Sequence, residues 1–201
     1  MTAGQRFILA SASPARRQVL EKARLTFEVK PSGVDEDELK ASFKAENMRA
    51  RDMADALAEA KAIKVSARMP DALVLGGDQI LVCNDVLFDK PPDMEHAAAH
   101  LMALSDKWHT LETAIVLAEE GRSIWRHVTR AKLKMRPLSQ ETISAYLAVV
   151  GPAALSSVGA YQLEGLGAQL FERIDGDFFT ILGLPLLPLL QQLRLRGMVM
   201  P

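Results

Sequence analysis

Carboxylate side chains recur in this sequence at points where an apolar run ends. Asp35 and Glu36 lie in GVDEDE, Asp78 ends the run ALVLGGD, and Glu164 stands between an apolar stretch and two glycines in YQLEGLG. Carboxylates can hold a hard divalent cation and orient a water molecule. Each position alone is also compatible with a turn residue or with the solvated start of a helix.

Basic side chains accompany these carboxylates. Lys61 lies in EAKA on the apolar side of a predicted helix, among alanines small enough to admit a ligand, and Lys90 precedes a diproline in FDKPPD. Arg16 and Arg17 occupy the first turn of another predicted helix, in ASASPARRQVLEKA. Because Arg and Lys neutralise phosphate oxygens, these residues and the carboxylates together predict a metal-assisted phosphate site.

The segment ASASPARRQVLEKA predicts how a strand turns into a helix. Ser13 can accept from the free N–H groups of the first helical turn, and Pro14 suits the first helical position. The positive end of the helix dipole disfavours two arginines in that turn unless an anion binds there. Two interpretations therefore stay open: a capped helix with solvated arginines, or a phosphate site that includes Ser11, Ser13 and Arg16.

Three common catalytic motifs are absent from the sequence. GGDQ lacks the ending of a P-loop, GLGAQL is not a dinucleotide fingerprint, and no Gly-x-Ser-x-Gly nucleophile elbow occurs. His96 and His100 stand four residues apart in EHAAAH, but the surrounding alanines favour a solvated helical face over a zinc site. Cys83, the only cysteine, lies in an apolar stretch and is expected to be an inert core thiol with no internal disulfide.

The composition is that of an ordinary globular chain of 201 residues, 49% hydrophobic and 24% charged. Its length suits one domain over residues 1–201, and no repeat or linker divides it. The formal net charge of -1 and the lack of a Lys/Arg-rich tract argue against a long nucleic-acid partner. The most apolar stretch, FFTILGLPLLPLL, is too short to span a bilayer and no signal peptide is evident, so we expect a cytoplasmic protein without a membrane partner.

The hydrophobic periodicity predicts strands that alternate with helices, followed by a strand-rich middle. The expected strands cover 6–11, 26–31, 72–78, a hairpin around Asn84-Asp85, 109–118, 123–135, 158–163 and 168–174. The expected helices cover 14–24, 48–68, 94–104, a segment from Ser139 to about Val149, and 183–195. This order is typical of an α/β fold with a mixed sheet.

Four segments, read in order, resemble the successive motifs of the Maf-type nucleoside triphosphate pyrophosphatases. They are LASASPARRQVLEKARLTFEVKPSGVDE, VLGGDQILV, DKPPDMEHAAAHLMALS and VGAYQLEGLGAQLFERIDGDFFTILGLPL, and the resemblance runs from Phe7 to about Leu193. It implies an elongated, twisted mixed sheet flanked by helices, like that of inosine triphosphatases. It also implies cytoplasmic hydrolysis of a nucleotide between its α and β phosphates, with a divalent metal cation, magnesium or manganese, as cofactor.

The resemblance implies roles for individual residues as well. Asp78 matches the catalytic aspartate and, together with Glu36, is expected to hold the metal. The residues expected to bind the substrate are Ser11, Ser13, Arg16, Lys61 and Lys90. The chain departs from the family pattern at Ala15, Ala60 and Asp106, and none of these changes touches the catalytic aspartate.

Three positions bear on the choice of substrate. The thymidine/uridine-preferring branch typically has Arg, Thr and Gln where this chain has Ala15, Gln79 and Glu164. Gln79 and Glu164 resemble instead the branch that acts on 7-methyl-GTP, which can carry a large aromatic residue at the position of Ala15. We therefore expect 7-methyl-GTP or another modified nucleotide as the small-molecule substrate. A dTTP/UTP pyrophosphatase is the alternative within the family, a nucleotide-binding cell-division regulator with little turnover is the alternative outside it, and a homodimer stays open.

Overall fold

A computed structural model describes residues 5–200 and is built around a seven-stranded mixed sheet. The strand order is β2-β1-β3-β5-β6-β7, with β4 paired to β3. β1, β2 and β3 run parallel, whereas the other pairs are antiparallel. The strands are β1 (Arg6–Leu9), β2 (Glu28–Val29), β3 (Ala72–Cys83), β4 (Val86–Phe88), β5 (Trp108–Glu119), β6 (Arg122–Met135) and β7 (Phe171–Asp175).

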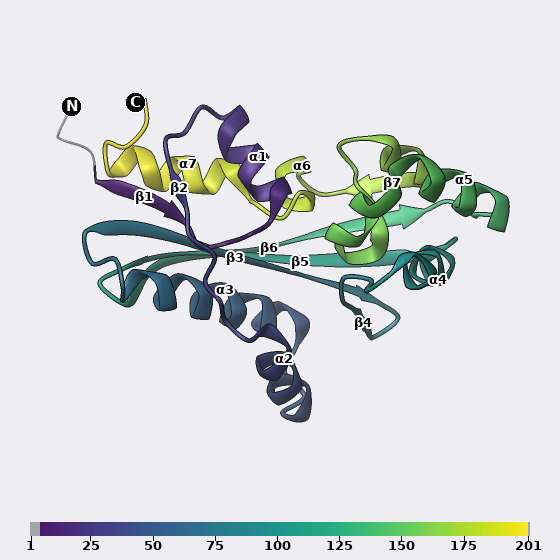
Figure 1. Ribbon diagram of the computed structural model, residues 1–201, viewed down its shortest axis with the longest axis horizontal. Helices are drawn as coiled ribbons and strands as arrows, with labels where there is room; N and C mark the ends of the chain where they lie inside the picture. Colours follow the sequence, from purple (N-terminus) through teal and green to yellow (C-terminus); the bar gives the residue numbers. More distant parts are fainter. Residues whose placement is uncertain (1–4, 201) are drawn as a thin grey trace.

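Helices cover both faces of this sheet and gather at one end of it. In Figure 1, α3 lies below the sheet, α1 and α7 lie above it, and α4 and α5 lie at the right-hand end. The α-helices are α1 (Pro14–Lys22), α2 (Glu36–Ala45), α3 (Ala50–Ser66), α4 (Met94–Leu104), α5 (Gln140–Val150), α6 (Phe178–Ile181) and α7 (Leu186–Leu195). Three 3-10 helices, η1 (Gly151–Ser156), η2 (Val158–Ala160) and η3 (Leu166–Leu170), follow α5.

Small residues let α3 approach the sheet closely. Its inner face carries Ala58 and Ala62, which pack with buried residues of β3 and β5. A Cβ atom at Gly76 of β3 would lie 2.2 Å from the carbonyl oxygen of Ala58 and 2.8 Å from the Cβ of Ala62. Only glycine therefore fits at this position, and the close contact brings Lys61 of the same helix against β3.

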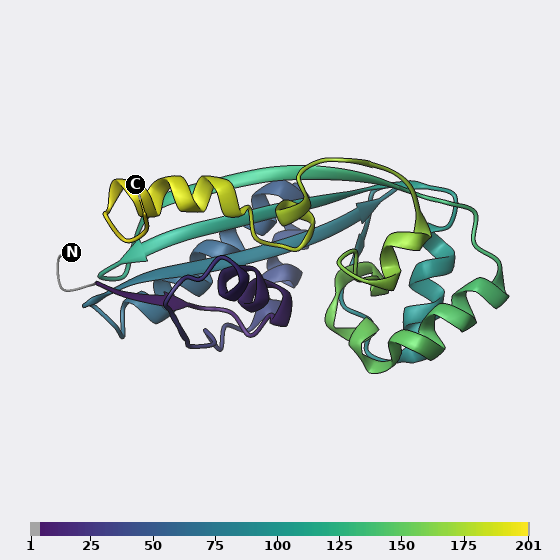
Figure 2. The same cartoon turned by 90° about the horizontal axis from the view of Figure 1, so that it is seen from above.

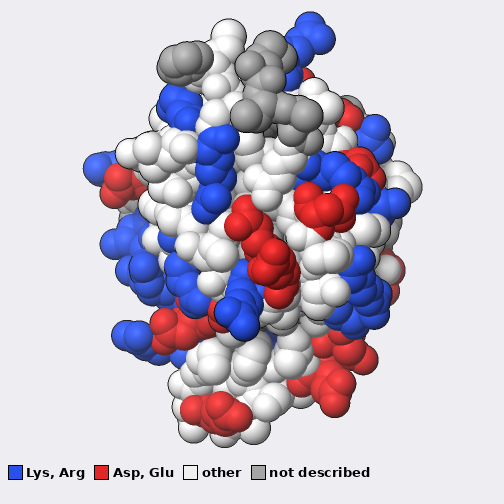
Figure 3. All heavy atoms as spheres, turned by 90° about the vertical axis from the view of Figure 1, so that its left-hand side faces the viewer, with Lys and Arg blue, Asp and Glu red and all other residues white. Residues whose placement is uncertain are grey.

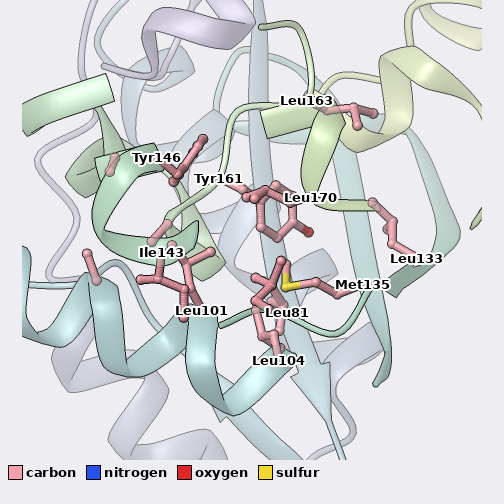
Figure 4. Packing of buried hydrophobic residues seen from close by; sticks show 14 of the residues in the cluster. Leu81, Leu101, Leu104, Leu133, Met135, Ile143, Tyr146, Tyr161, Leu163 and Leu170 are labelled. Carbon is pink, nitrogen blue, oxygen red and sulfur yellow. The ribbon is translucent and has the colours of Figure 1, made fainter. Parts of the chain in front are cut away.

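Two further hydrophobic clusters hold the two ends of the molecule. One lies between the other face of the sheet and α1 and α7, with Leu9, Leu20, Leu75 and Leu189 buried in it. The other packs α4, α5 and the 3-10 helices against the far ends of β3, β5 and β6, as Figure 4 shows around Leu81 and its labelled neighbours. Figure 2 shows β5 and β6 running the length of the molecule between these two groups of helices.

The α/β class and most predicted elements are confirmed, and three predictions about strands are wrong. The strand expected over 72–78 does not end at Asp78, because β5 pairs with it continuously through its glycines and β3 extends to Cys83. The segment 158–163 is not a strand, since Gly159 and Ala160 have φ angles of 77° and 60° and form η2. The strand expected over 168–174 begins only at Phe171, because η3 occupies the preceding residues.

Two helices were not predicted as elements. α2 has no fully buried residue, and Leu39 and Phe43 are its only large apolar side chains, packed partly buried against the core, so its periodicity signal is short. α6 is only four residues long and lies inside the apolar run FFTILGLPLLPLL, which a break after Ile181 divides between α6 and α7. Among residues 5–200, no helix is long and apolar enough to cross a membrane. Figure 3 shows basic and acidic side chains interspersed over the end of the molecule that carries the termini.

We predict that Gly76→Ala destabilises the fold by about 3 kcal/mol, the upper part of the range for overpacked cores. The added methyl group would overlap a backbone carbonyl of α3, which cannot move without displacing the helix. Urea denaturation of the variant and the wild type measures the effect. Gly165→Ala is the control, because a Cβ there meets no atom within 4 Å. Equal unfolding midpoints for Gly76→Ala and the wild type would contradict the close contact between α3 and β3.

Candidate active site

The site lies where β3 has a free edge. β1 pairs with β3 only as far as Leu75, and β4 pairs with it only from Leu81. In the described part of the chain, Gly76–Ile80 thus pairs with β5 on one side and with no strand on the other. A cavity of about 580 Å³ opens at this gap, beside the end of β1. Its size suits a small-molecule ligand, and its place agrees with the preference of α/β sheets for binding beyond the carboxyl ends of parallel strands.

The segment between β1 and α1 lines one side of this cavity and is held by two serines. Ser11 Oγ accepts from the Ser13 N–H at 3.2 Å, and Ser13 Oγ accepts from the Arg16 N–H at 3.4 Å. Ser13 is therefore the N-cap of α1, and Pro14 occupies the first turn, as the sequence predicts. This turn places the start of α1 at the cavity.

The two arginines in the first turn of α1 have different surroundings. Arg16 is 8% exposed, and it donates from Nε to the Gly183 carbonyl oxygen at 2.7 Å and from Nη1 to Ser11 Oγ at 3.1 Å. Burial lowers the pKa of Arg16, although nearby carboxylates oppose this effect. Arg17 is exposed and pairs with Glu21 at 2.7 Å. Arg16 therefore belongs to the cavity, whereas Arg17 belongs to the surface.

Lys61 lies between two carboxylates in the cavity. Its Nζ is 2.6 Å from Asp78 Oδ1 and 2.8 Å from Glu36 Oε1. Lys61 and Asp78 are buried, whereas the Glu36 side chain is 43% exposed. Partial burial opposes ionisation of Glu36, but the Lys61 ammonium outweighs it and the pKa of Glu36 lies below its usual value. Since an unpaired buried charge is strongly destabilising, the three groups depend on one another.

One carboxylate oxygen of Asp78 has no hydrogen-bond partner in the described part of the chain. Its Oδ2 is buried and makes no hydrogen bond within residues 5–200. This oxygen and the half-exposed Glu36 fit a divalent cation, because magnesium is often bound through one or two carboxylates together with substrate phosphates and water. No group of three or more His, Cys, Asp or Glu side chains in the described ranges is placed to hold a metal alone. A metal here would therefore need further ligands from a bound substrate.

Two further lysines, Lys40 and Lys90, line the cavity. Burial and the charge of Arg16 lower the pKa of Lys90. Lys40 Nζ lies 2.6 Å from Asp89 Oδ1, and both of these residues line the cavity. Sequence reasoning missed Lys40 and Asp89. The available signal was the position of Lys40 four residues after Glu36, which puts the two side chains on one face of α2.

The opposite half of the cavity contains no lysine or arginine among its described lining residues. Tyr161 and Leu163 are buried there, and Glu164 is exposed. The Tyr161 hydroxyl is 2.9 Å from His109 Nε2, and burial lowers the pKa of His109 to about 4, which keeps its imidazole neutral at pH 7. This half suits an uncharged or cationic ring better than a phosphate.

The structure brings every residue predicted for the site to this one cavity. They are Ser11, Ser13, Ala15, Arg16, Glu36, Lys61, Asp78, Gln79, Lys90 and Glu164. These residues come from separate segments of the chain that meet at the free edge of β3. Their individual roles in catalysis, metal binding and specificity stay predictions.

The other groups singled out from the sequence lie elsewhere. His96 Nδ1 is 2.8 Å from Asp93 Oδ1 at the exposed start of α4, and the His100 ring lies against Phe88. His96 therefore agrees with the predicted solvated helical face, whereas His100 does not, because its ring is partly buried and its Nδ1 is shut away from solvent. Cys83 is buried, and burial raises the pKa of its thiol, as expected for an inert core cysteine.

Comparison with known proteins gives matches along almost the whole chain. A family model described as Maf-like protein matches residues 6–196. A nucleoside triphosphate pyrophosphatase from Hyphomonas neptunium is 54% identical over 188 residues, which are 94% of this chain and 94% of the relative. A 7-methyl-GTP pyrophosphatase from Rhizobium etli is 51% identical over 194 residues, which are 96% of this chain and 98% of the relative. Because the family match spans all the segments that line the cavity, this chain belongs to the Maf family.

Proposed function

We propose that this chain is a metal-dependent nucleoside triphosphate pyrophosphatase, which hydrolyses the α–β phosphate bond to give a nucleoside monophosphate and pyrophosphate. The observation that carries the proposal is the pairing of Lys61 with both Asp78 and Glu36 beside the buried Arg16. Cations alone would suffice for nucleotide binding, whereas a buried carboxylate with an unpartnered oxygen suits hydrolysis. The relatives named as nucleoside triphosphate pyrophosphatases support the same activity.

The charges in the cavity match the needs of this reaction. Arg16, Lys61 and Lys90 can neutralise phosphate oxygens, on which negative charge accumulates as pyrophosphate leaves. Asp78 Oδ1 is bonded to Lys61, so Oδ2 is the oxygen left for both proposed roles: one of its lone pairs can face the cation, and the other can accept a proton from the attacking water. The water oxygen bonds to the α phosphorus, the bond from that phosphorus to the bridging oxygen breaks, and the proton passes from Asp78 to solvent afterwards.

Glu36 and Asp78 are the residues we expect to hold the divalent cation, magnesium or manganese. When bound, the cation would neutralise phosphate charge and polarise water. The wider proposal includes a cytoplasmic location, where a chain with a single free cysteine would stay reduced. A homodimer is compatible with this proposal and is not required by it.

We further propose 7-methyl-GTP, or another modified nucleotide, as the substrate. Glu164 is a carboxylate at the half of the cavity that carries no basic side chain. A carboxylate accepts two hydrogen bonds from the adjacent N1–H and amino group of guanine, and methylation at N7 adds a positive charge to the ring. Thymine and uracil place two carbonyl oxygens beside their single N–H, which an ionised Glu164 would repel. Relatives named 7-methyl-GTP pyrophosphatase support this choice.

A nucleotide-binding regulator of cell division with little turnover is the alternative from a different class. Release of pyrophosphate by the purified protein in the presence of magnesium separates the two functions. A regulator would bind the nucleotide and leave the triphosphate intact. The buried Asp78, which nucleotide binding alone does not need, favours the enzyme.

We predict that Asp78→Asn keeps the fold at reduced stability, because the buried Lys61 retains only Glu36 as a charged partner, and loses at least ~100-fold in kcat, the scale of a lost general base. The amide keeps the shape of the carboxylate but cannot take the proton from water. A pyrophosphate-release assay measures the loss, and a thermal melt checks the fold. Asp71→Asn, an exposed aspartate bonded to Arg6, serves as the matched control and should keep normal activity. Normal turnover by a folded Asp78→Asn variant would refute the assignment.

We predict that Arg16→Ala reduces kcat/KM by at least ~10-fold, whereas Arg17→Ala changes it by less than ~2-fold. Arg16 is buried in the cavity, and Arg17 is an exposed partner of Glu21. Steady-state kinetics of the two variants make the comparison. Arg16→Lys keeps the charge and should recover part of the loss if the phosphate contact matters. An equal effect of the two alanine variants would exclude the predicted phosphate site.

We predict that kcat/KM for 7-methyl-GTP exceeds that for dTTP and UTP by ~10-fold or more, about 1.4 kcal/mol in transition-state binding. Glu164→Gln should narrow this gap, since its amide can also donate to a carbonyl oxygen. Glu141→Gln, an exposed change in α5, is the control. A panel in which dTTP or UTP is the better substrate would transfer the assignment to the thymidine/uridine branch.

A further inference from the structure

The Gln79 side chain is held at one end by three oxygen atoms. Its Nε2 lies 2.8 Å from Thr113 Oγ1, 3.0 Å from the Thr180 carbonyl oxygen and 3.2 Å from the Ile181 carbonyl oxygen. The Thr113 hydroxyl donates in turn to the Thr180 carbonyl at 3.1 Å, so its lone pair is free to accept from Gln79. Thr113 is completely buried, and Gln79 is partly exposed in the cavity.

The chemistry of these partners fixes which end of the amide faces them. A carbonyl oxygen only accepts hydrogen bonds, so the end of Gln79 that faces two carbonyls must be the NH₂ group. With the amide turned over, Gln79 Oε1 would take this place and oppose the carbonyl oxygens of Thr180 and Ile181. That arrangement would bring three acceptors together, and the single proton of the Thr113 hydroxyl could serve only one of them at a time.

The remaining end of the amide is Oε1. Within residues 5–200 it has no hydrogen-bond partner, and it is not among the unpartnered atoms that are shut away from solvent. A free glutamine can turn its amide and meet either a donor or an acceptor. Gln79 cannot do so while its NH₂ group is bonded to β5 and α6, so it offers the cavity an acceptor only.

We propose that Thr113 is a specificity-positioning residue. Its buried hydroxyl, with the carbonyls of α6, orients Gln79 so that the cavity selects nucleotides that bring a hydrogen-bond donor to Oε1. The donor is the exocyclic amino group of the base or a ribose hydroxyl. This proposal rests on the proposed function only in taking a nucleotide as the ligand.

The segment that fixes Gln79 also contacts the phosphate half of the cavity. Asp177 Oδ2 accepts from the Thr180 N–H at 2.7 Å and caps α6. Two residues after α6, Gly183 accepts from Arg16 Nε at 2.7 Å, in a left-handed conformation with φ of 83°. Displacement of α6 would therefore disturb Arg16 and weaken the binding of every nucleotide by a similar factor. A freed Gln79 amide would instead change only the discrimination between nucleotides.

The experiment compares Thr113→Val, which has nearly the same shape but no hydroxyl, with Thr113→Ser, which keeps the hydroxyl. Thr110→Val, on the same strand and the opposite face of the sheet, is the control. Each protein is tested with GTP, with ITP, which lacks the 2-amino group, and with 2′-deoxy-GTP and 3′-deoxy-GTP. The readouts are kcat/KM for pyrophosphate release and, independently of turnover, Kd by calorimetry with the α,β-methylene analogues of the same nucleotides.

We expect removal of one of these donors to lower kcat/KM and raise Kd of the wild type by about 5–10-fold, the value of one hydrogen bond. In Thr113→Val, the same removal should change kcat/KM and Kd by less than ~2-fold. Thr113→Ser and Thr110→Val should show the same change of about 5–10-fold as the wild type when the donor group is removed. A loss with ITP that Thr113→Val removes would identify the base as the source of the donor, because a loss caused by Glu164 would persist in that variant. A loss with a deoxy analogue that Thr113→Val removes would identify the ribose.

Two results would overturn the proposal. One is a Thr113→Val variant in which kcat/KM and affinity fall by the same factor for all four nucleotides, because Thr113 would then have only a structural role. The other is a wild-type protein whose kcat/KM and Kd do not change when any of these donor groups is removed from the nucleotide. Absence of pyrophosphate release by the wild type, with the expected ratios still present in Kd, would overturn the proposed hydrolysis and support the role of Thr113.

Discussion

A buried ammonium group requires carboxylate partners, and this requirement connects three distant parts of the chain. Lys61 comes from α3, Asp78 from the centre of β3, and Glu36 from the first turn of α2. Without Lys61, Asp78 would be an unpaired buried charge, and Glu36 would lose the ion pair that lowers its pKa. The interaction therefore brings both carboxylates to the cavity, and together with Leu39 and Phe43 it joins α2 to the body of the protein.

The interruption of pairing along β3 makes room for the ligand. A continuous parallel neighbour would fill the space beside Gly76–Ile80, but β1 ends at Leu9 and β4 pairs only with the far end of β3. β5 holds this stretch of β3 from the other side, so the free edge stays extended. The absence of side chains at Gly76 and Gly77 permits close packing on both faces of the sheet. α3 lies close to Gly76 on one face, and Arg16 lies close to Gly77 on the other.

The cavity combines a charged half with a half that has no basic side chain among residues 5–200, and β3 carries residues for both. Asp78 lies with Lys61 on the α3 side of the sheet, and Gln79, the next residue along the strand, points to the α6 side. This alternation is the ordinary period of a β-strand, and it places the proposed hydrolytic carboxylate next to the residue proposed to face the rest of the nucleotide. The short α6 then links Gln79 and Arg16, so recognition and phosphate binding share one support.

The sequence by itself determined the features that depend on near neighbours. The Ser13 cap followed by Pro14, the long helix that presents Lys61 and the hairpin at Asn84-Asp85 follow from local hydrogen bonding and periodicity, and all are present. Only the tertiary structure decided that Arg16 is buried against the Gly183 carbonyl, that β3 continues through its glycines, and that α2 forms a helix with only two large apolar side chains, Leu39 and Phe43, packed on the core. These outcomes depend on partners far away in the chain, such as Gly183 for Arg16 and β5 for β3, which spacing along the sequence does not encode.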